Sequence, residues 1–262
     1  MKRILILLAV LAAGFASSAQ NKFEHKTFTS SEGLSLNYRL LEPSAAGKGK
    51  KYPLVIFLHG AGERGSDNES QLKHGGQMFL NPINRCKYPA YVIFPQCPQE
   101  SYWAFGKIPE SSNNSRNALI NVRYDADPPA ITSALKELIM EHIALPDVDP
   151  SRVYIMGLSM GGMGTFDLVT RCPDLFAAAI PICGAADTEK LAKTTGVKWR
   201  IFHGDADEVV PVECSRKAYT ILKDAGADVE YFEFPGCNHG SWNPAFNQPD
   251  FMKWLFTQKK RK

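Results

Sequence analysis

The sequence predicts an α/β domain with a mostly parallel central sheet and helices on both of its faces. Three observations lead to this prediction. Strands and helices alternate from residue 54 to the end of the chain, as β–α–β crossovers require. The run from Leu54 to Leu58 is unbroken and apolar, which is typical of a strand buried on both faces. With 262 residues and 44% hydrophobic content, the chain can bury one large core.

The expected elements follow in chain order. Residues 22–29 and 34–41 are predicted as edge strands joined by a turn at 31–33. Residues 54–58 and 90–94 are predicted as buried strands, and 96–127 as a long loop that crosses over the site. A helix is expected to begin after Pro128 and Pro129 and to reach Ile143. The other expected elements are helices at 160–171, 188–194, 213–225 and 251–258, and strands at 177–182, 198–202 and 229–234.

Residues 1–19 have the pattern of a signal peptide. Lys2 and Arg3 precede an apolar segment, and small residues at 16–19 form a cleavage site before Gln20. The apolar segment is short for a membrane span. We therefore expect an exported protein, periplasmic or secreted, with one catalytic domain over residues 20–262 and no membrane span after signal removal. A retained membrane anchor is the alternative.

Charge and cysteine content limit the partners. The formal net charge is only +3, which gives no reason to expect nucleic acid as a partner. In an oxidising compartment the six cysteines could form up to three disulfides, such as Cys86 with Cys97, and free buried thiols are the alternative. The histidines are scattered, and neither a CxxC nor an HExxH motif occurs. No metal site is expected.

The segment from Val153 to Gly164 carries the first catalytic signal. An apolar run is followed by Gly157-x-Ser159-x-Gly161, the pattern of a sharp turn between a buried strand and a helix that presents a nucleophilic serine. A Cβ at either glycine would collide with the neighbouring strand or helix. The start of the following helix and the Met160 N–H favour negative charge beside the serine.

An acid and a histidine follow Ser159 at later strand ends. Asp205 and Asp207 come after the strand at 198–202, and His239 comes after the strand at 229–234. Catalytic groups in such sheets gather at the carboxyl ends of the strands. His239 is expected to remove the serine proton, and a carboxylate on its other nitrogen to fix the imidazole tautomer. From these residues alone, either aspartate could be the acid.

The fourth part of the expected site is the glycine-rich turn from His59 to Gly65. Its backbone can present an N–H to a developing oxyanion. We expect Ala61 as the first donor, with Gly62 as the alternative, and Met160 as the second. The turn lacks the GxxxxGK[ST] order of a phosphate-binding loop, so a nucleotide site is not expected.

These motifs resemble the α/β-hydrolase superfamily over essentially the whole mature chain. Leu58 to Gly65, Gly157 to Gly162 and His239 to Trp242 resemble one esterase branch, with polyhydroxybutyrate depolymerase-like and feruloyl or acetyl-xylan esterase-like enzymes that are often labelled as peptidases. The resemblance implies ester hydrolysis through an acyl-serine, with no cofactor. The His-Gly-x-x-Asp-x-x-Val-Pro pattern of the branch assigns the acid to Asp207 rather than Asp205.

Aromatic residues near the expected site suggest a substrate. Three aromatic residues cluster in the long loop: Tyr102, Trp103 and Phe105. Trp242 lies three residues after His239. Such rings could stack on a feruloyl group or a sugar, or they could pack a lid. The leading hypothesis is a secreted serine carboxylesterase that hydrolyses feruloyl or acetyl esters of plant cell-wall polysaccharide. A serine peptidase of the same fold is the alternative, and a complete triad argues against a non-catalytic binding protein.

Overall fold

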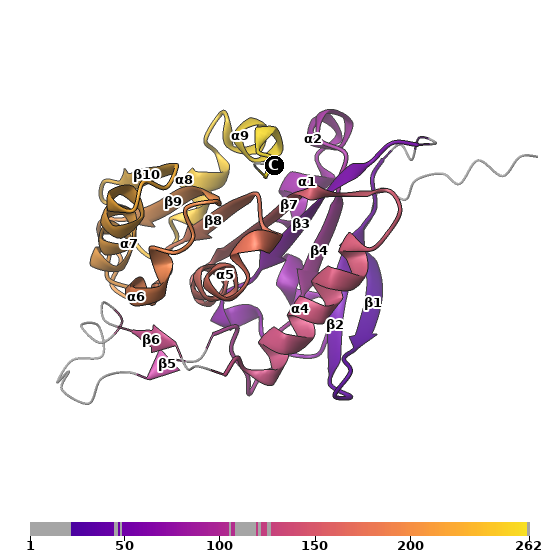
Figure 1. Ribbon diagram of the computed structural model, residues 1–262, viewed down its shortest axis with the longest axis horizontal. Coiled ribbons are helices and arrows are strands. Elements are labelled where there is room, and N and C mark those ends of the chain that lie inside the picture. The colour runs from indigo at the N-terminus through magenta and orange to yellow at the C-terminus, as the bar shows by residue number, and fades with distance from the viewer. Residues whose placement is uncertain are drawn as a thin grey trace, which may run out of the picture.

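An eight-stranded sheet between two layers of helices forms the centre of the computed structural model (Figure 1). The structure describes residues 22–44, 47, 49–104, 106–107, 119, 122–124 and 127–260. The expected signal peptide, Phe105 and much of the loop at 96–127 lie outside the described residues.

The sheet has the strand order β1-β2-β4-β3-β7-β8-β9-β10. The hairpin of β1 and β2 is antiparallel, β2 also pairs antiparallel with β4, and the other neighbours are parallel. The carboxyl ends of the parallel strands therefore meet at one edge. The strands are β1 (Glu24–Thr29), β2 (Ser35–Leu41), β3 (Tyr52–Leu58), β4 (Tyr91–Pro95), β7 (Val148–Leu158), β8 (Ala178–Ile182), β9 (Lys198–Gly204) and β10 (Val229–Phe234).

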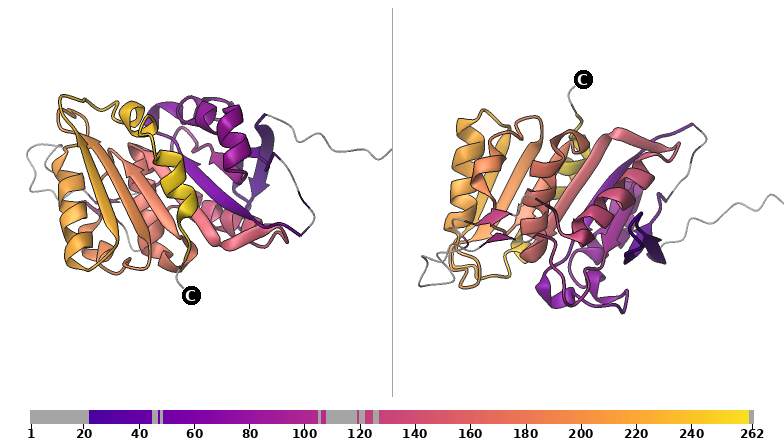
Figure 2. Two further views of the ribbon diagram at one scale, coloured as in Figure 1. Left: turned by 90° about the horizontal axis from the view of Figure 1, so that it is seen from above. Right: turned by 60° about the horizontal axis from the view of Figure 1, so that its bottom comes forward.

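Helices cover both faces of this sheet, as Figure 2 shows from two directions. One face carries α4, α5, α6 and α7, and the other carries α1, α8 and α9. A short α2 follows α1, and a two-stranded sheet of β5 (Gly106–Lys107) and β6 (Arg123–Tyr124) lies apart. The helices are α1 (Gly76–Leu80), α2 (Pro82–Lys87), α4 (Ala130–Ile143), α5 (Met160–Arg171), α6 (Thr188–Leu191), α7 (Glu213–Asp224), α8 (Trp242–Phe246) and α9 (Phe251–Thr257).

Residue alternation in β3 explains why the sheet is covered on both sides. Leu54 and Ile56 point into the cluster that α4 and α5 close, whereas Val55 and Phe57 point into the cluster that α1 and α9 close. Every residue of β3 is buried. All side chains of an apolar run without alternation are therefore buried only when the strand lies inside a sheet with helices on both faces. The predicted fold class is confirmed.

The structure also contains elements that the sequence interpretation did not expect. The sequence predicts no helix between the strands at 54–58 and 90–94, but this segment contains α1 and α2. Pro82 is the first residue of α2. The Asn81 side chain before it accepts hydrogen bonds from the N–H groups of Ile83 and Asn84. Helix α8 and the pair β5–β6 were also missed, because each is too short to show a period.

All six cysteines are free, so the free-thiol alternative describes the structure. The suggested disulfide between Cys86 and Cys97 is therefore not formed. Within the described part of the chain, no helix is long and apolar enough to cross a membrane.

Candidate active site

Ser159 occupies a strained turn between β7 and α5. Its backbone has φ 54° and ψ −119°, a conformation that L-residues rarely adopt. Both flanking glycines are required. A Cβ on Gly157 would lie 2.3 Å from the Gly161 carbonyl oxygen, and one on Gly161 would lie 2.0 Å from the Leu58 carbonyl oxygen. The Ser159 N–H donates to the Ile182 carbonyl at 2.9 Å, which fixes the turn to β8.

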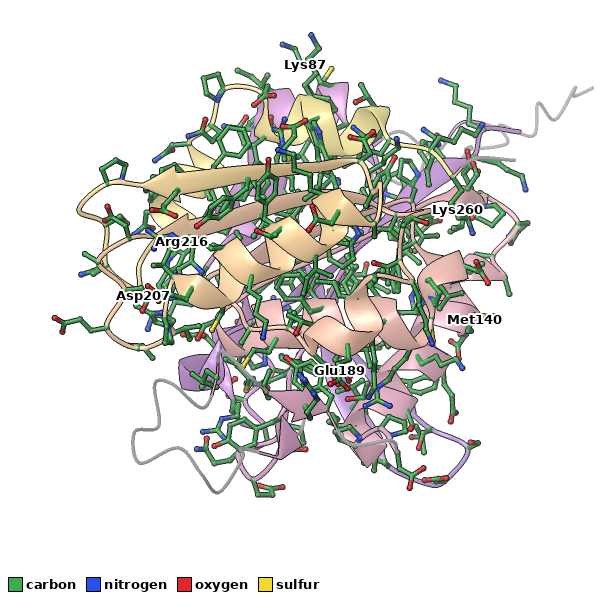
Figure 3. All side chains as sticks on the ribbon, turned by 60° about the vertical axis from the view of Figure 1, so that its left-hand side comes forward. Lys87, Met140, Glu189, Asp207, Arg216 and Lys260 are labelled. Carbon is green, nitrogen blue, oxygen red and sulfur yellow. The ribbon has the colours of Figure 1, made fainter. Side chains whose placement is uncertain are left out.

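The structure brings Ser159, His239 and Asp207 together from three separate strand ends. His239 Nε2 lies 2.8 Å from Ser159 Oγ, and His239 Nδ1 lies 2.7 Å from Asp207 Oδ2. Figure 3 shows Asp207 in the turn beyond β9. The serine and histidine are half-buried, and the aspartate is buried. This chain of contacts can move a proton from the serine to the imidazole while the carboxylate holds the ring.

Asp207 is held as a carboxylate by four hydrogen-bond donors. The N–H groups of Val209 and Val210 donate to its Oδ1 at 2.8 and 2.9 Å, and His239 and His203 lie on its Oδ2. Burial raises the pKa of Asp207, but the hydrogen bonds from His203, His239 and the two amides outweigh burial and hold that pKa well below its usual range. A carboxylate that stays ionised can stabilise the imidazolium that forms during catalysis.

His203 is a part of the site that sequence reasoning missed. The side chain is fully buried, with Nδ1 2.7 Å from Ser215 Oγ and Nε2 3.0 Å from the Val210 carbonyl oxygen. Its Nε2 also lies 3.2 Å from Asp207 Oδ2, the same oxygen that His239 Nδ1 contacts, so it supports the carboxylate together with His239. The His203-Gly204 pair that opens the acid motif is the signal that could have found it.

Asp205 does not reach the histidine in this arrangement. It is exposed, and its Oδ1 accepts a hydrogen bond from the Gly236 N–H at 2.6 Å. It therefore links the two turns that carry Asp207 and His239, as short acidic side chains often do with turn amides.

The turn after β3 lies against the serine. Ala61 begins a short 3₁₀ turn, and a Cβ added at Gly60 would lie 3.7 Å from the Ser159 Cβ. Among the described residues, neither the Ala61 N–H nor the Met160 N–H donates a hydrogen bond. The Ala61 carbonyl accepts from Arg64 Nε at 3.0 Å, which helps to fix the orientation of the turn. Both N–H groups are thus available to a bound oxyanion.

His59 anchors this turn as a neutral imidazole. Its Nδ1 donates to the Gly60 carbonyl at 2.6 Å, and its Nε2 accepts from the Cys97 N–H at 2.9 Å. The two bonds define one tautomer because one ring nitrogen donates and the other accepts. Burial lowers the pKa of His59 to about 4.

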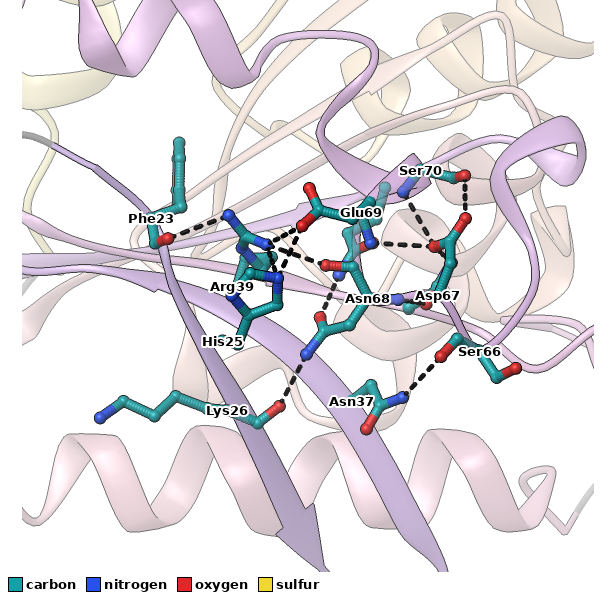
Figure 4. A network of polar contacts seen from close by, with 12 residues as sticks. Phe23, His25, Lys26, Asn37, Arg39, Ser66, Asp67, Asn68, Glu69 and Ser70 are labelled. Carbon is teal, nitrogen blue, oxygen red and sulfur yellow. Dashed lines mark hydrogen bonds and ion pairs between the residues drawn. The ribbon is translucent and has the colours of Figure 1, made fainter.

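A polar network holds the segment that follows the turn (Figure 4). Buried Arg39 on β2 donates to the carbonyl oxygens of Phe23 and Asn68 and to the Glu69 carboxylate. Asp67 accepts from the Ser70 N–H and hydroxyl. The edge hairpin therefore ties the loop beside the site to the sheet.

The two tryptophans suggested as substrate contacts lie in different surroundings. Trp103 is 1% exposed, and its Nε1 donates to the His59 carbonyl at 3.2 Å. That burial leaves no ring face for a ligand, so Trp103 supports the fold and the substrate interpretation of this residue was wrong. Trp242 is half-buried, and its ring centroid lies 5.7 Å from that of His239 and 5.0 Å from that of His74. Tyr102 is 40% exposed, with the Arg64 guanidinium 4.4 Å above its ring.

One group of possible metal ligands occurs among the described residues. Cys183, Asp207 and His239 offer ligand atoms that all lie within 4.8 Å of one another. Burial raises the pKa of the Cys183 thiol far above its ordinary value, and the carboxylate and imidazole already contact each other. Within this group the carboxylate and the imidazole belong to the chain of contacts that ends on Ser159 Oγ.

Comparison with known proteins agrees with this geometry. The family model for phospholipases and carboxylesterases matches residues 44–249, well over half of the chain. The chain belongs to this family. It is similar to carboxylesterase SOBER1 of Arabidopsis thaliana, at 25% identity over 72% of this chain and 84% of the relative. It is also similar to poly(3-hydroxyalkanoate) depolymerase C of Paucimonas lemoignei, at 28% identity over 70% of this chain but only 39% of the relative.

A solved structure extends the comparison. The crystal structure of a thermostable esterase superposes with a TM-score of 0.80 at 36% identity, covering 92% of this chain and 64% of that chain. The family member described here is therefore a serine hydrolase of the α/β-hydrolase superfamily that acts on carboxylic esters.

Proposed function

We propose that Ser159, His239 and Asp207 catalyse ester hydrolysis with Ala61 and Met160 as the oxyanion donors. The observation that carries the proposal is the continuous contact from Asp207 Oδ2 through the His239 ring to Ser159 Oγ, with distances of 2.7 and 2.8 Å. These residues need no cofactor for the reaction.

The reaction follows from this geometry. His239 Nε2 takes the Ser159 hydroxyl proton as Oγ forms a bond to the ester carbonyl carbon. The carbonyl oxygen becomes an oxyanion that the Ala61 and Met160 N–H groups stabilise. The C–O bond to the alcohol then breaks, and the alcohol leaves with the proton from Nε2. Water attacks the acyl-serine by the same route and releases the carboxylic acid.

The proposed substrates are feruloyl or acetyl esters carried by plant cell-wall polysaccharide. The half-buried Trp242 ring beside His239 and the exposed Tyr102 ring beside the oxyanion turn support this choice. Both rings can stack on an aromatic acyl group or on a sugar. The similarity to a polyester depolymerase also favours a polymeric substrate.

The proposed location is outside the cytoplasm, since residues 1–19 have a signal-peptide pattern. Expression of the full chain in a bacterial host, followed by N-terminal sequencing of the exported protein, tests this. The expected new N-terminus is Gln20. An intact chain that stays with the cells contradicts export.

The substrate proposal is tested with matched esters. Methyl ferulate, acetylated xylan, p-nitrophenyl acetate and aminoacyl-anilides are offered to the wild type and to Ser159→Ala. We expect ester hydrolysis that the substitution abolishes, with kcat/KM for the feruloyl ester above that for an acetyl ester of the same alcohol. Trp242→Leu should reduce the feruloyl preference, and Phe246→Leu in the same helix, packed against Phe57 and Phe251, serves as the control. Preferential cleavage of the anilides contradicts the proposal.

A further inference from the structure

A basic hollow opens at the end of the sheet opposite the catalytic residues. It encloses about 430 Å³ between the start of β3, the end of α2 and helix α9. Four lysines line it: Lys50, Lys51, Lys87 and Lys253. All four are exposed. A second hollow of about 550 Å³ shares Lys50, Tyr52 and Pro89 with it, so the two hollows lie side by side, and together we call them the trough.

Among the described residues, the lysines of this hollow make no direct ion pair. No aspartate or glutamate lines it, and none of the four lysines has a carboxylate partner within 4.0 Å among the described residues. Arg152, which also lines it, is paired with Asp149 at 2.8 Å and donates to the Lys51 carbonyl at 2.7 Å. Like charges held together without partners repel one another, and an anion in the hollow would relieve that repulsion.

Aromatic rings accompany the lysines. Tyr88 and Phe256 both line the hollow, and their ring centroids lie 5.1 Å apart with a 32° tilt. Phe256 also packs edge-on against buried Tyr154 of β7, whose hydroxyl donates to the Gln258 carbonyl at 2.7 Å. The Lys260 N–H donates to the Ser151 carbonyl at 2.9 Å. The wall formed by α9 is thus fixed to the sheet.

The hollow is separate from the catalytic centre. Lys50 and Lys51 precede β3, whereas the oxyanion turn follows its last residue. Seven residues of parallel strand span roughly 20 Å. Figure 3 shows Lys87 on the surface beside α9, and Lys260 and Asp207 at opposite sides of the molecule. A ligand that reaches both places must be long.

We propose that this trough binds an anionic polysaccharide whose sugar residues carry carboxylates, such as a uronate polymer. Lysines can pair with the carboxylates while Tyr88 and Phe256 pack against the faces of the sugar rings. A concave site suits a chain better than a flat bilayer, and none of the exposed large apolar side chains of the described residues lines it. The choice of a polysaccharide among polyanions rests on the proposed function. The trough would hold the polymer while its ester groups reach Ser159.

The test measures binding by calorimetry in the Ser159→Ala background, where no ester is turned over. De-esterified polygalacturonate oligomers are compared with neutral xylan oligomers and with vesicles that contain phosphatidylglycerol. The double variant Lys87→Gln/Lys253→Gln removes two charges from the trough. The double variant Lys193→Gln/Lys223→Gln removes two exposed charges elsewhere and is the matched control.

We expect polygalacturonate to bind and the trough variant to weaken its Kd by roughly three- to thirtyfold, as two exposed ion pairs would give. The control variant should stay within twofold of wild type, and added salt should weaken binding. In the presence of Ser159, the trough variant should hydrolyse p-nitrophenyl acetate at the wild-type rate, which separates this site from the catalytic proposal. Absence of polygalacturonate binding, equal binding of neutral xylan, equal losses in the two variants, or binding to the vesicles alone would each overturn the inference.

Discussion

Trp103→Ala separates a structural role from a substrate-binding role most clearly. The indole is 1% exposed, and its N–H donates to the His59 carbonyl at the base of the oxyanion turn. The Trp103 carbonyl accepts from the Thr132 hydroxyl of α4 at 2.7 Å. A Cβ at Gly164 would lie 2.4 Å from the Trp103 Cβ, so α5 also packs closely against this residue. Trp103 therefore joins α4 and α5 to the turn that presents Ala61.

The size of the effect follows from these contacts. Replacing a buried Trp with Ala costs about 3–5 kcal/mol, and the His59 carbonyl loses its partner as well. For a domain of this size, the melting temperature should fall by roughly 10 °C. Because the oxyanion turn loses its support, kcat/KM should fall by the same factor for acetyl and feruloyl esters.

Urea unfolding and paired ester kinetics measure both effects. Tyr102→Ala is the control for the unfolding measurement only, since that neighbouring ring is 40% exposed and its loss should change stability little. If Trp103→Ala kept its stability within about 1 kcal/mol and lost activity only on the feruloyl ester, the structural role assigned to Trp103 would be refuted.

Three further substitutions test the parts of the site. Asp207→Asn should lower kcat by about 10⁴ because His239 is left in the wrong tautomer. Asp205→Asn should change mainly thermal stability, and the reverse ranking in steady-state kinetics would reassign the acid. Gly161→Ala should abolish activity and soluble expression because its Cβ meets backbone, whereas Gly62→Ala, which has open space, should express normally; equal yields would contradict the geometry. Burial lowers the pKa of His59 from 6.5 to about 4, so between those pH values the unfolded state binds a proton that the folded state does not. The free energy of unfolding should therefore fall by about 3 kcal/mol as the pH drops through this window, and an equally steep fall in His59→Gln would be inconsistent with this assignment.

The parallel strands and the catalytic order could be predicted because each has a strong local signal. An apolar run such as Leu54 to Leu58 fits only a strand covered on both faces, and glycines at 157 and 161 fit only a tight turn. The choice of Asp207 over Asp205 came from a family pattern, and the structure now gives its physical reason. Asp207 is buried beside His239, whereas Asp205 faces solvent.

Other features depend on contacts between distant segments and leave no local signal. Nothing near Trp103 in the sequence shows that the ring will be buried, so the sequence left a substrate contact and a packing role both open. His203 becomes part of the site only because β9 carries it next to the turn that contains Asp207. The basic trough joins segments around Lys50, Lys87 and Lys253, which are about 40 to 200 residues apart in the chain.

Covalent labelling of Ser159 tests the central claim most directly. The purified protein is treated with a fluorophosphonate probe, and its intact mass and the modified peptide are determined by mass spectrometry. We expect a single adduct on Ser159, loss of esterase activity in proportion to labelling, and no adduct in Ser159→Ala. Undiminished labelling of Ser159→Ala, or full activity of the labelled protein, would contradict the assignment of Ser159 as the nucleophile.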